Sequence, residues 1–108
     1  MSDNQELDII LLRSFLAVSE TLHFTSAAQM RGVTQSTISQ HINRLEQAVG
    51  ASLLHRTTKQ VELTPQGMKM VGFAQNIIHA QEMAMGYFRG GTLRSELRLG
   101  IAEDMVVS

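Results

Sequence analysis

Two helical patterns separated by a glycine constrain the fold of this chain more than any other feature. The second pattern has apolar residues at the spacing of one buried helix face, namely Ile38, Ile42, Leu45 and Val49. The first pattern, residues 25–30, is short and rich in small side chains, which let a second helix cross it closely. Gly32 lies between the patterns and suits the left-handed residue that ends a helix. This order of short helix, glycine turn and longer helix is typical of a helix-turn-helix motif.

Capping residues set the bounds of the predicted helices. We expect Asp8 to cap a first helix over about 8–21, where apolar residues also recur at helical spacing. Thr25 is predicted to cap the short second helix. Thr34 is predicted to cap the third helix, over about 35–49. The apolar faces of these three helices are sufficient for a common core.

A short hairpin and a long helix follow. Residues 53–56 and 61–63 are predicted to form two strands around a polar tip. Thr64 then caps a helix over 64–89, with Pro65 at the first helical position, where its missing N–H is harmless. We therefore predict a mainly α fold, a winged helix-turn-helix of three helices plus a two-stranded wing, followed by a long linker helix.

The long helix carries an apolar seam that its own domain is too small to cover. At 1.5 Å per residue the helix is about 39 Å long, which exceeds the width of a small domain. The seam residues recur at alternating intervals of three and four, and they are Met70, Phe73, Ile77, Ala80, Ala84 and Tyr87. A heptad seam of this kind favours a homodimer through the linker helix. Packing against a further domain of the same chain is the alternative.

Opposite its apolar stripe, the third helix carries amides and hydroxyls. The residues of this polar face and its flanks are Ser36, Thr37, Gln40, Asn43, Arg44 and Gln47. Glutamine and asparagine side chains can pair with adenine in the major groove of DNA. The hydroxyls of Thr25 and Thr34, beside free N–H groups at helix starts, can hold phosphates. A solvated face would be the ordinary interpretation for an isolated helix, but its position between a glycine turn and a basic hairpin indicates DNA binding.

The charge of the chain is unevenly distributed. The formal net charge is −1 and the isoelectric point is near 6.4, which by itself disfavours a nucleic-acid partner. Between residues 31 and 59, however, the only acidic residue is Glu46, whereas four residues are basic, Arg31, Arg44, Arg56 and Lys59. Because a polyanion responds to the local field more than to the global sum, this basic segment is compatible with double-stranded DNA.

Several classes of function lack their signatures. The chain has no cysteine, and its four histidines are scattered without the spacing of paired metal ligands. No glycine-rich phosphate or dinucleotide motif and no nucleophile motif is present. We therefore predict that the chain is not an enzyme and needs no metal or cofactor. No apolar run approaches the roughly 20 residues that cross a bilayer, so we predict no membrane partner and a cytoplasmic location.

Taken together, these motifs resemble those of LysR-type transcriptional regulators. The similar segments are residues 12–18 and 24–28 in the first two helices, 33–46 in the third, 50–56 in the wing and 63–67 at the start of the long helix. The resemblance covers about residues 7–101, nearly the whole chain, and several linked motifs make it specific. It implies a bacterial transcription factor, repressor or activator, whose winged domains pair through antiparallel linker helices.

The resemblance also implies a division of the chain and a set of contacts. Residues 1–63 would be the DNA-binding domain, 64–91 the dimerisation helix, and 92–108 a hinge and the first strand of a truncated effector-binding domain, since 97–101 alternate apolar and other residues. The resemblance places five residues in the major groove, namely Gln35, Ser36, Thr37, Ser39 and Gln40. The resemblance also places Thr25, Thr34 and Arg44 on the DNA backbone. Arg56 and Lys59 of the wing would reach phosphate or the minor groove.

The chain departs from the pattern of the family at four positions. Leu22-His23 stands where many relatives carry Gly-Ser, which makes the approach to the second helix bulkier. Leu54 replaces the usual phenylalanine, a conservative change in the core. Gln40 occupies a position often taken by arginine, so we expect a preference for A·T base pairs there.

One helix in one groove covers too few base pairs for genomic specificity. A two-fold dimer would place two recognition helices about one helical turn or a multiple apart, which predicts a pseudo-palindromic operator. The resemblance further implies a tetramer for the full-length protein, with RNA polymerase as a candidate partner. Two alternatives stay open: a different winged-helix DNA binder, and a protein-interaction module that uses only the seam of the long helix.

Overall fold

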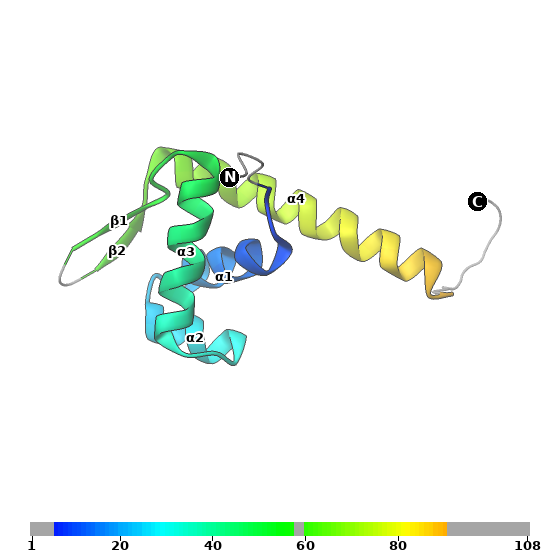
Figure 1. Ribbon diagram of the computed structural model, residues 1–108, viewed down its shortest axis with the longest axis horizontal. Coiled ribbons are helices and arrows are strands. Elements are labelled where there is room, and N and C mark those ends of the chain that lie inside the picture. The colour runs from blue at the N-terminus through cyan, green and yellow to red at the C-terminus, as the bar shows by residue number, and fades with distance from the viewer. Residues whose placement is uncertain (1–5, 58–59, 91–108) are drawn as a thin grey trace, which may run out of the picture. The chain divides into compact units, whose positions relative to one another are not determined.

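Four helices and a two-stranded sheet make up the part of the chain that the structure, a computed structural model, describes, residues 6–57 and 60–90 (Figure 1). In chain order they are α1 (Ile9–Thr21), α2 (Phe24–Arg31), α3 (Gln35–Val49), β1 (Leu54–Arg56), β2 (Val61–Leu63) and α4 (Pro65–Phe88). The predicted winged helix-turn-helix with a following long helix is therefore confirmed. The predicted strand at 97–101 lies outside the described residues.

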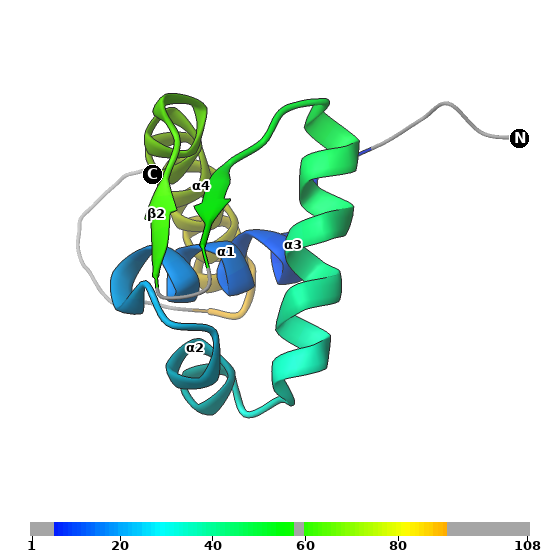
Figure 2. The same ribbon diagram turned by 90° about the vertical axis from the view of Figure 1, so that its left-hand side faces the viewer.

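The hydrophobic core lies among α1, α2 and α3, which pack on one another pairwise (Figure 2). Its largest fully buried side chains include Leu12 and Phe15 of α1 and Ile38, Ile42 and Leu45 of α3. These are the apolar positions whose helical spacing predicted the buried faces. Burial of each such side chain contributes on the order of 1.5–3 kcal/mol, so the core fixes how α3 is presented to solvent.

Two of the three helix starts in the core follow the predicted capping. The Asp8 carboxylate accepts a hydrogen bond from the Ile10 N–H at 2.8 Å, and the Thr34 hydroxyl accepts one from the Thr37 N–H at 3.1 Å. Gly32 ends α2 in the left-handed conformation, with φ of 70°, which a side chain would disfavour. The helix-turn-helix geometry thus rests on the residues that predicted it.

The prediction that Thr25 caps α2 is wrong. The helix begins earlier, at Phe24, and the N-cap is His23, whose ring Nδ1 accepts a hydrogen bond from the Ser26 N–H at 3.3 Å. The start shifts because Leu22 adopts a left-handed conformation, with φ of 52°, and turns the chain directly after α1. Thr25 consequently lies in the first turn of α2 and its hydroxyl is not used as a cap.

The wing is an antiparallel hairpin built on the core. Leu54 pairs with Leu63 and Arg56 with Val61. Leu54 is buried and Leu63 packs against the core from the second strand, so the base of the wing is anchored by apolar contacts. The outer part of each strand projects from this anchor (Figure 1).

The first half of α4 belongs to the same core. Thr64 caps the helix as predicted, since its hydroxyl accepts a hydrogen bond from the Gly67 N–H at 2.9 Å. Three apolar side chains of α4 are buried, namely Met70, Ala74 and Ile78. Met70 therefore packs inside its own domain, whereas the predicted seam had placed it on the side of α4 that faces a partner. Phe73 and Tyr87 of the predicted seam are 60% and 72% exposed.

Gly67 is required where α4 passes the wing. A Cβ at this position would collide with the backbone carbonyl of Leu53, which cannot move because it accepts the Thr64 N–H at 3.0 Å. Gly72, on the same helix, has open space around it. The glycine at position 67 is therefore explained by the close approach of α4 to the backbone at Leu53, and not by helix geometry.

We expect Gly67→Ala to lower the free energy of unfolding by more than about 1 kcal/mol, although alanine favours a helix over glycine by about that amount. Gly72→Ala is the matched control and should raise stability, because it brings the same gain in helix propensity without a clash. Urea unfolding followed by circular dichroism measures both. Equal stabilisation by the two substitutions would contradict the close approach.

Candidate nucleic-acid interface

The solvent-facing side of α3 is entirely polar. Its exposed residues are Gln35, Ser36, Gln40, Asn43, Arg44 and Gln47, and Thr37 and Ser39 beside them are half-buried. The opposite side of the helix carries Ile38, Ile42 and Leu45, which have no exposed surface. Since the apolar side is locked into the core, the polar side has a fixed orientation, and its amides and hydroxyls can both donate and accept hydrogen bonds.

The start of α3 is linked to the start of α2. The Thr25 hydroxyl donates a hydrogen bond to Gln35 Oε1 at 3.1 Å. Gln35 therefore keeps its amide NH₂ group available as a donor. The Thr34 hydroxyl donates to the Thr37 hydroxyl at 3.0 Å while it caps the helix. Four of the predicted site residues are thus brought together in two hydrogen-bonded pairs.

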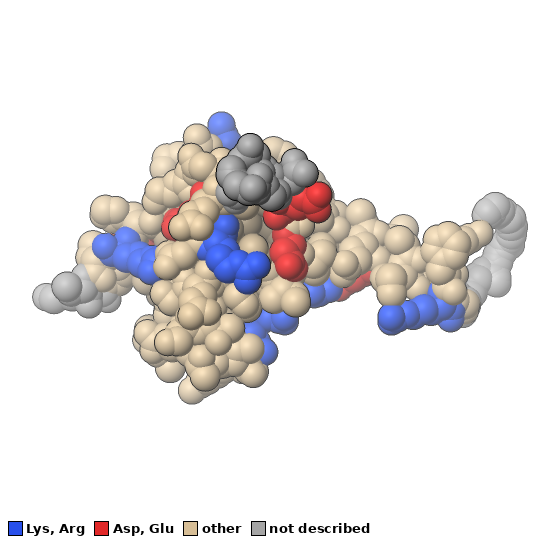
Figure 3. Space-filling view, in the orientation of Figure 1, with Lys and Arg blue, Asp and Glu red and all other residues tan. Residues whose placement is uncertain are grey.

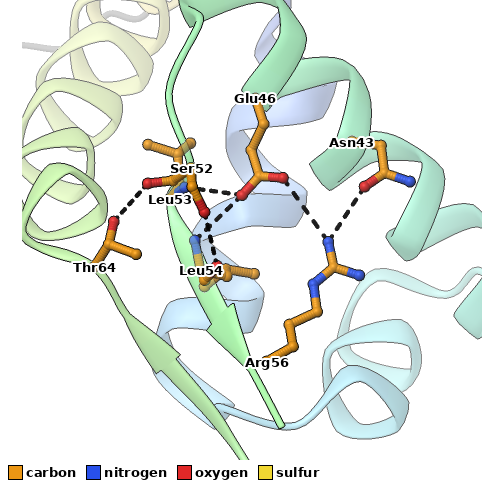
Figure 4. A network of polar contacts seen from close by, with 7 residues as sticks. All are labelled: Asn43, Glu46, Ser52, Leu53, Leu54, Arg56 and Thr64. Carbon is orange, nitrogen blue, oxygen red and sulfur yellow. Dashed lines mark hydrogen bonds and ion pairs between the residues drawn. The ribbon is translucent and has the colours of Figure 1, made fainter.

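One carboxylate joins the end of α3 to the base of the wing (Figure 4). Glu46 Oε2 accepts hydrogen bonds from the backbone N–H groups of Leu53 at 2.8 Å and Leu54 at 3.2 Å. The neighbouring Thr64 hydroxyl donates to the carbonyl of Ser52 at 2.6 Å. The strand β1 is therefore attached to α3 on one side and to the start of α4 on the other.

The side chain of Arg56 turns from the wing toward the helices (Figure 4). Its guanidinium donates a hydrogen bond to Asn43 Oδ1 at 3.3 Å and lies 4.0 Å from the Glu46 carboxylate. The guanidinium carbon also lies 4.8 Å from the centroid of the Phe24 ring, within the range of a cation–π contact. Sequence reasoning had placed Asn43 on the polar face without selecting it, and the Glu46 and Phe24 contacts were missed.

A groove runs between the start of α2, the start of α3 and the wing. It is lined by the N-cap His23 and by Phe24 and Thr25 of α2, by Gln35 and Ser39 from α3, and by Arg56, Thr57, Gln60 and Val61 from the wing. Four predicted site residues, Thr25, Gln35, Ser39 and Arg56, therefore share one concave surface. Ser36 and Gln40 lie on the exposed face of α3 outside this lining, and Lys59 lies outside the described residues.

On the face shown in Figure 3, basic side chains lie over α3 and over the wing among other places, and the largest group of acidic ones lies beside the segment that leads into α1. This separation agrees with the basic segment seen in the sequence. The surface formed by α3 and the wing therefore carries basic side chains that can attract a polyanion.

His41 connects α3 to α1 instead of facing solvent. Its Nδ1 lies 2.7 Å from the hydroxyl of Ser14, which is 1% exposed and is the buried polar residue of the described core. Burial lowers the pKa of His41, and the nearby Arg44 and Arg31 lower it further against an opposing effect of Asp8. The imidazole is therefore held in its neutral form at neutral pH and contributes no charge to the surface of α3.

Other kinds of site find no support within residues 6–57 and 60–90. No group of three or more metal-ligating side chains comes together there. None of the helices in that part of the chain is both long and apolar enough to span a membrane.

Comparison with known proteins identifies the family. The family model of bacterial regulatory helix-turn-helix proteins of the lysR family matches residues 9–68. A probable hydrogen peroxide-inducible genes activator of Mycobacterium avium is 40% identical over 88% of this chain and 31% of its own length. The HTH-type transcriptional regulator DgdR of Burkholderia cepacia is 37% identical over 93% of this chain and 34% of its own. The chain thus spans about a third of the length of these two relatives.

Solved structures agree with this identification. DarR of Vibrio fischeri in complex with DNA has a TM-score of 0.75 and 32% identity, covering 78% of this chain and 29% of that one. The CbnR_DBD-DNA complex has the same TM-score with 27% identity and covers 79% of this chain and 98% of that one. Both of these related folds are therefore seen in complex with DNA.

The contact of His41 with Ser14 predicts a pH dependence of stability. Because the folded state lowers the pKa of His41, the unfolded chain binds the proton first as the pH falls below the ordinary value of about 6.5. The free energy of unfolding should therefore decrease as the pH falls below that value and should be unaffected by this group above it.

Urea unfolding at pH 7.5 and pH 5.5 tests this expectation. We expect the unmodified chain to lose more stability between the two pH values than the His41→Gln variant, whose amide can still bond to Ser14 but does not titrate. The same loss in both proteins would show that His41 does not produce the dependence.

Proposed function

Because the chain belongs to the lysR family of bacterial regulatory helix-turn-helix proteins, we propose that its winged helix-turn-helix reads a specific DNA sequence with α3. The members of this family are DNA-binding transcription regulators and not enzymes. The observation that carries the proposal is the polar, outward face of α3, which is held in a fixed orientation by Ile38, Ile42 and Leu45 on its buried side. An α-helix fits the major groove of B-form DNA, where every base pair presents a distinct pattern of donors and acceptors.

Base edges are contacted from the first half of α3. The residues proposed for this role are Gln35, Ser36, Thr37, Ser39 and Gln40, which begin at the first residue of the helix. Gln40 is exposed and carries the amide that can pair with adenine through one donor and one acceptor. The predicted preference for A·T base pairs at this position rests on that side chain.

The DNA backbone is held around the rim of this surface. Thr25 and Thr34 bring hydroxyls to the starts of α2 and α3, and Arg44 brings an exposed charge on α3. Arg56 belongs to the wing, which flanks the groove beside α3, and Lys59, which lies outside the described residues, is proposed as a second basic contact. Contacts to phosphate fix the register of a protein on DNA and contribute most of the salt-dependent affinity.

Dimerisation through α4 is the second part of the proposal. Support comes from the apolar residues that α4 leaves uncovered on one helix face, Phe73, Ala80, Ala84 and Tyr87, with Ile77 partly buried between them. Met70 stays part of the core at the beginning of this seam. A two-fold pair of chains would read a pseudo-palindromic operator with two copies of α3.

The remaining assignments extend the proposal to the whole regulator. Residues 1–63 serve as the DNA-binding domain, 64–91 as the dimerisation helix, and 92–108 as a hinge and the beginning of an effector-binding domain. In the cytoplasm, the full-length protein assembles as a tetramer, and RNA polymerase is its candidate partner at a promoter. Support for these points comes from family membership alone.

A fluorescent A/T-rich palindromic duplex, titrated with the chain at two salt concentrations against unlabelled random DNA, tests the DNA-binding proposal. We expect binding that resists the random competitor and weakens with salt by about 0.9 logarithmic units per phosphate contact for each tenfold rise in salt concentration. Negligible binding at both salt concentrations would overturn the proposal and favour an interaction module that uses α4 alone.

The substitution Ala84→Glu tests the dimer by sedimentation at tens of micromolar. A charge buried in an apolar helix pair costs several kcal/mol, so we expect the variant to sediment as a monomer and the unmodified chain as a dimer. Gln75→Glu, exposed on the opposite side of α4, is the matched control and should leave the dimer intact. A monomeric unmodified chain would count against this part of the proposal.

A further inference from the structure

Asn43 lies on the exposed face of α3, one turn beyond Ser39 and Gln40, and its amide has a defined orientation. The Arg56 guanidinium donates to Asn43 Oδ1 at 3.3 Å. An asparagine amide has one acceptor end and one donor end. With Oδ1 turned toward the guanidinium, the Nδ2 group points away from Arg56 and is the end best placed to meet a ligand (Figure 4).

The guanidinium that orients Asn43 is itself held on three sides. Asn43 and Glu46 meet it from α3, and the Phe24 ring from α2 lies beneath it at 4.8 Å. Glu46 is in turn fixed by the backbone N–H groups of Leu53 and Leu54. The position of Arg56 therefore depends on the backbone at the base of the wing, and not only on flexible side chains.

We propose that Asn43 is a specificity-determining residue of the DNA interface and that Arg56 is the positioning residue that orients its amide. This inference rests on the proposed DNA-binding function and adds to it the role of two residues. Arg56 then serves the interface chiefly through Asn43, and this role replaces the backbone contact proposed for Arg56 above on the basis of the family resemblance.

The orientation predicts the kind of base that Asn43 prefers. In the bidentate pairing with adenine an asparagine uses both its donor and its acceptor. Here Oδ1 already accepts from Arg56 and Nδ2 is the end that points away from it, so Asn43 favours guanine, whose O6 and N7 both accept, over the bidentate pairing with adenine. The preference disappears if the guanidinium is lost, because nothing then fixes which end of the amide faces the DNA.

The choice of substitution at Arg56 separates positioning from charge. Lysine keeps the positive charge but lacks the planar fork that can meet Asn43, Glu46 and the Phe24 ring together. A residue that binds phosphate as a charge tolerates lysine, whereas a residue that orients a neighbour by its geometry does not. Arg56→Lys is therefore the decisive variant for positioning, and Asn43→Ala tests the side chain that is proposed to contact the base.

The experiment selects bound duplexes from a pool of double-stranded DNA with a randomised central segment, using the full chain. We expect the unmodified chain to select a two-fold motif. Asn43→Ala and Arg56→Lys should each lose about tenfold preference at the same base pair of each half-site, and the double variant should lose no more than either one. Gln75→Ala removes an exposed amide from α4 and not from the polar face of α3, and it is the control that should keep the motif.

Salt titration of the same proteins on the selected duplex supplies a second readout. We expect Arg56→Ala to change the slope of log affinity against log salt by clearly less than the value of about 0.9 that one phosphate contact contributes. A full loss of that value, or retention of the motif by Arg56→Lys or by Asn43→Ala, would overturn the inference. If the unmodified chain selects no motif at all, the proposed function fails instead.

Folding is checked on each variant by its thermal unfolding midpoint. Asn43 is exposed, so Asn43→Ala should fold like the unmodified chain. This variant therefore decides by itself whether the side chain at position 43 contributes to base preference. Asn43→Asp, of the same shape, gives a further test: it can still accept from Arg56 but has no donor to offer, and it should lose the same preference as Asn43→Ala.

Discussion

The two hydrogen bonds from the backbone N–H groups of Leu53 and Leu54 to the Glu46 carboxylate hold the proposed DNA-binding surface together. They attach the wing to the helix that carries the polar face, and they fix the carboxylate beside which Arg56 lies. Bonds of this kind to a charged acceptor contribute about 1.5–3 kcal/mol each. Without them the wing would keep its apolar anchor but lose its register against α3.

Helix α3 supplies both part of the core and the proposed DNA-reading surface, and the second depends on the first. Ile38, Ile42 and Leu45 fix the rotation of α3 about its axis, so the opposite side chains point outward in one arrangement. His41 lies between the two sides and joins α3 to Ser14 of α1. A rigid surface of amides and hydroxyls is the physical basis for reading bases without a large positive net charge.

The elements of the core could be predicted because they depend on local rules. The spacing of Ile38, Ile42 and Leu45 and the caps at Asp8 and Thr34 are properties of single helices, and the structure confirms them. The His23 cap was missed because imidazole is an unusual cap, and the burial of Met70 because helical spacing alone does not say which face of α4 meets the core. The Arg56 contacts were unpredictable, since they depend on the register of the wing.

The most direct test of DNA reading by α3 is an NMR titration of the isotope-labelled chain with a DNA duplex, in which backbone amide shifts are followed residue by residue. The largest changes should fall on the first three turns of α3, on the start of α2 and on the wing, with the buried face of α1 and the seam of α4 little affected. Changes confined to α4, with α3 unperturbed, would contradict the proposal that α3 reads DNA.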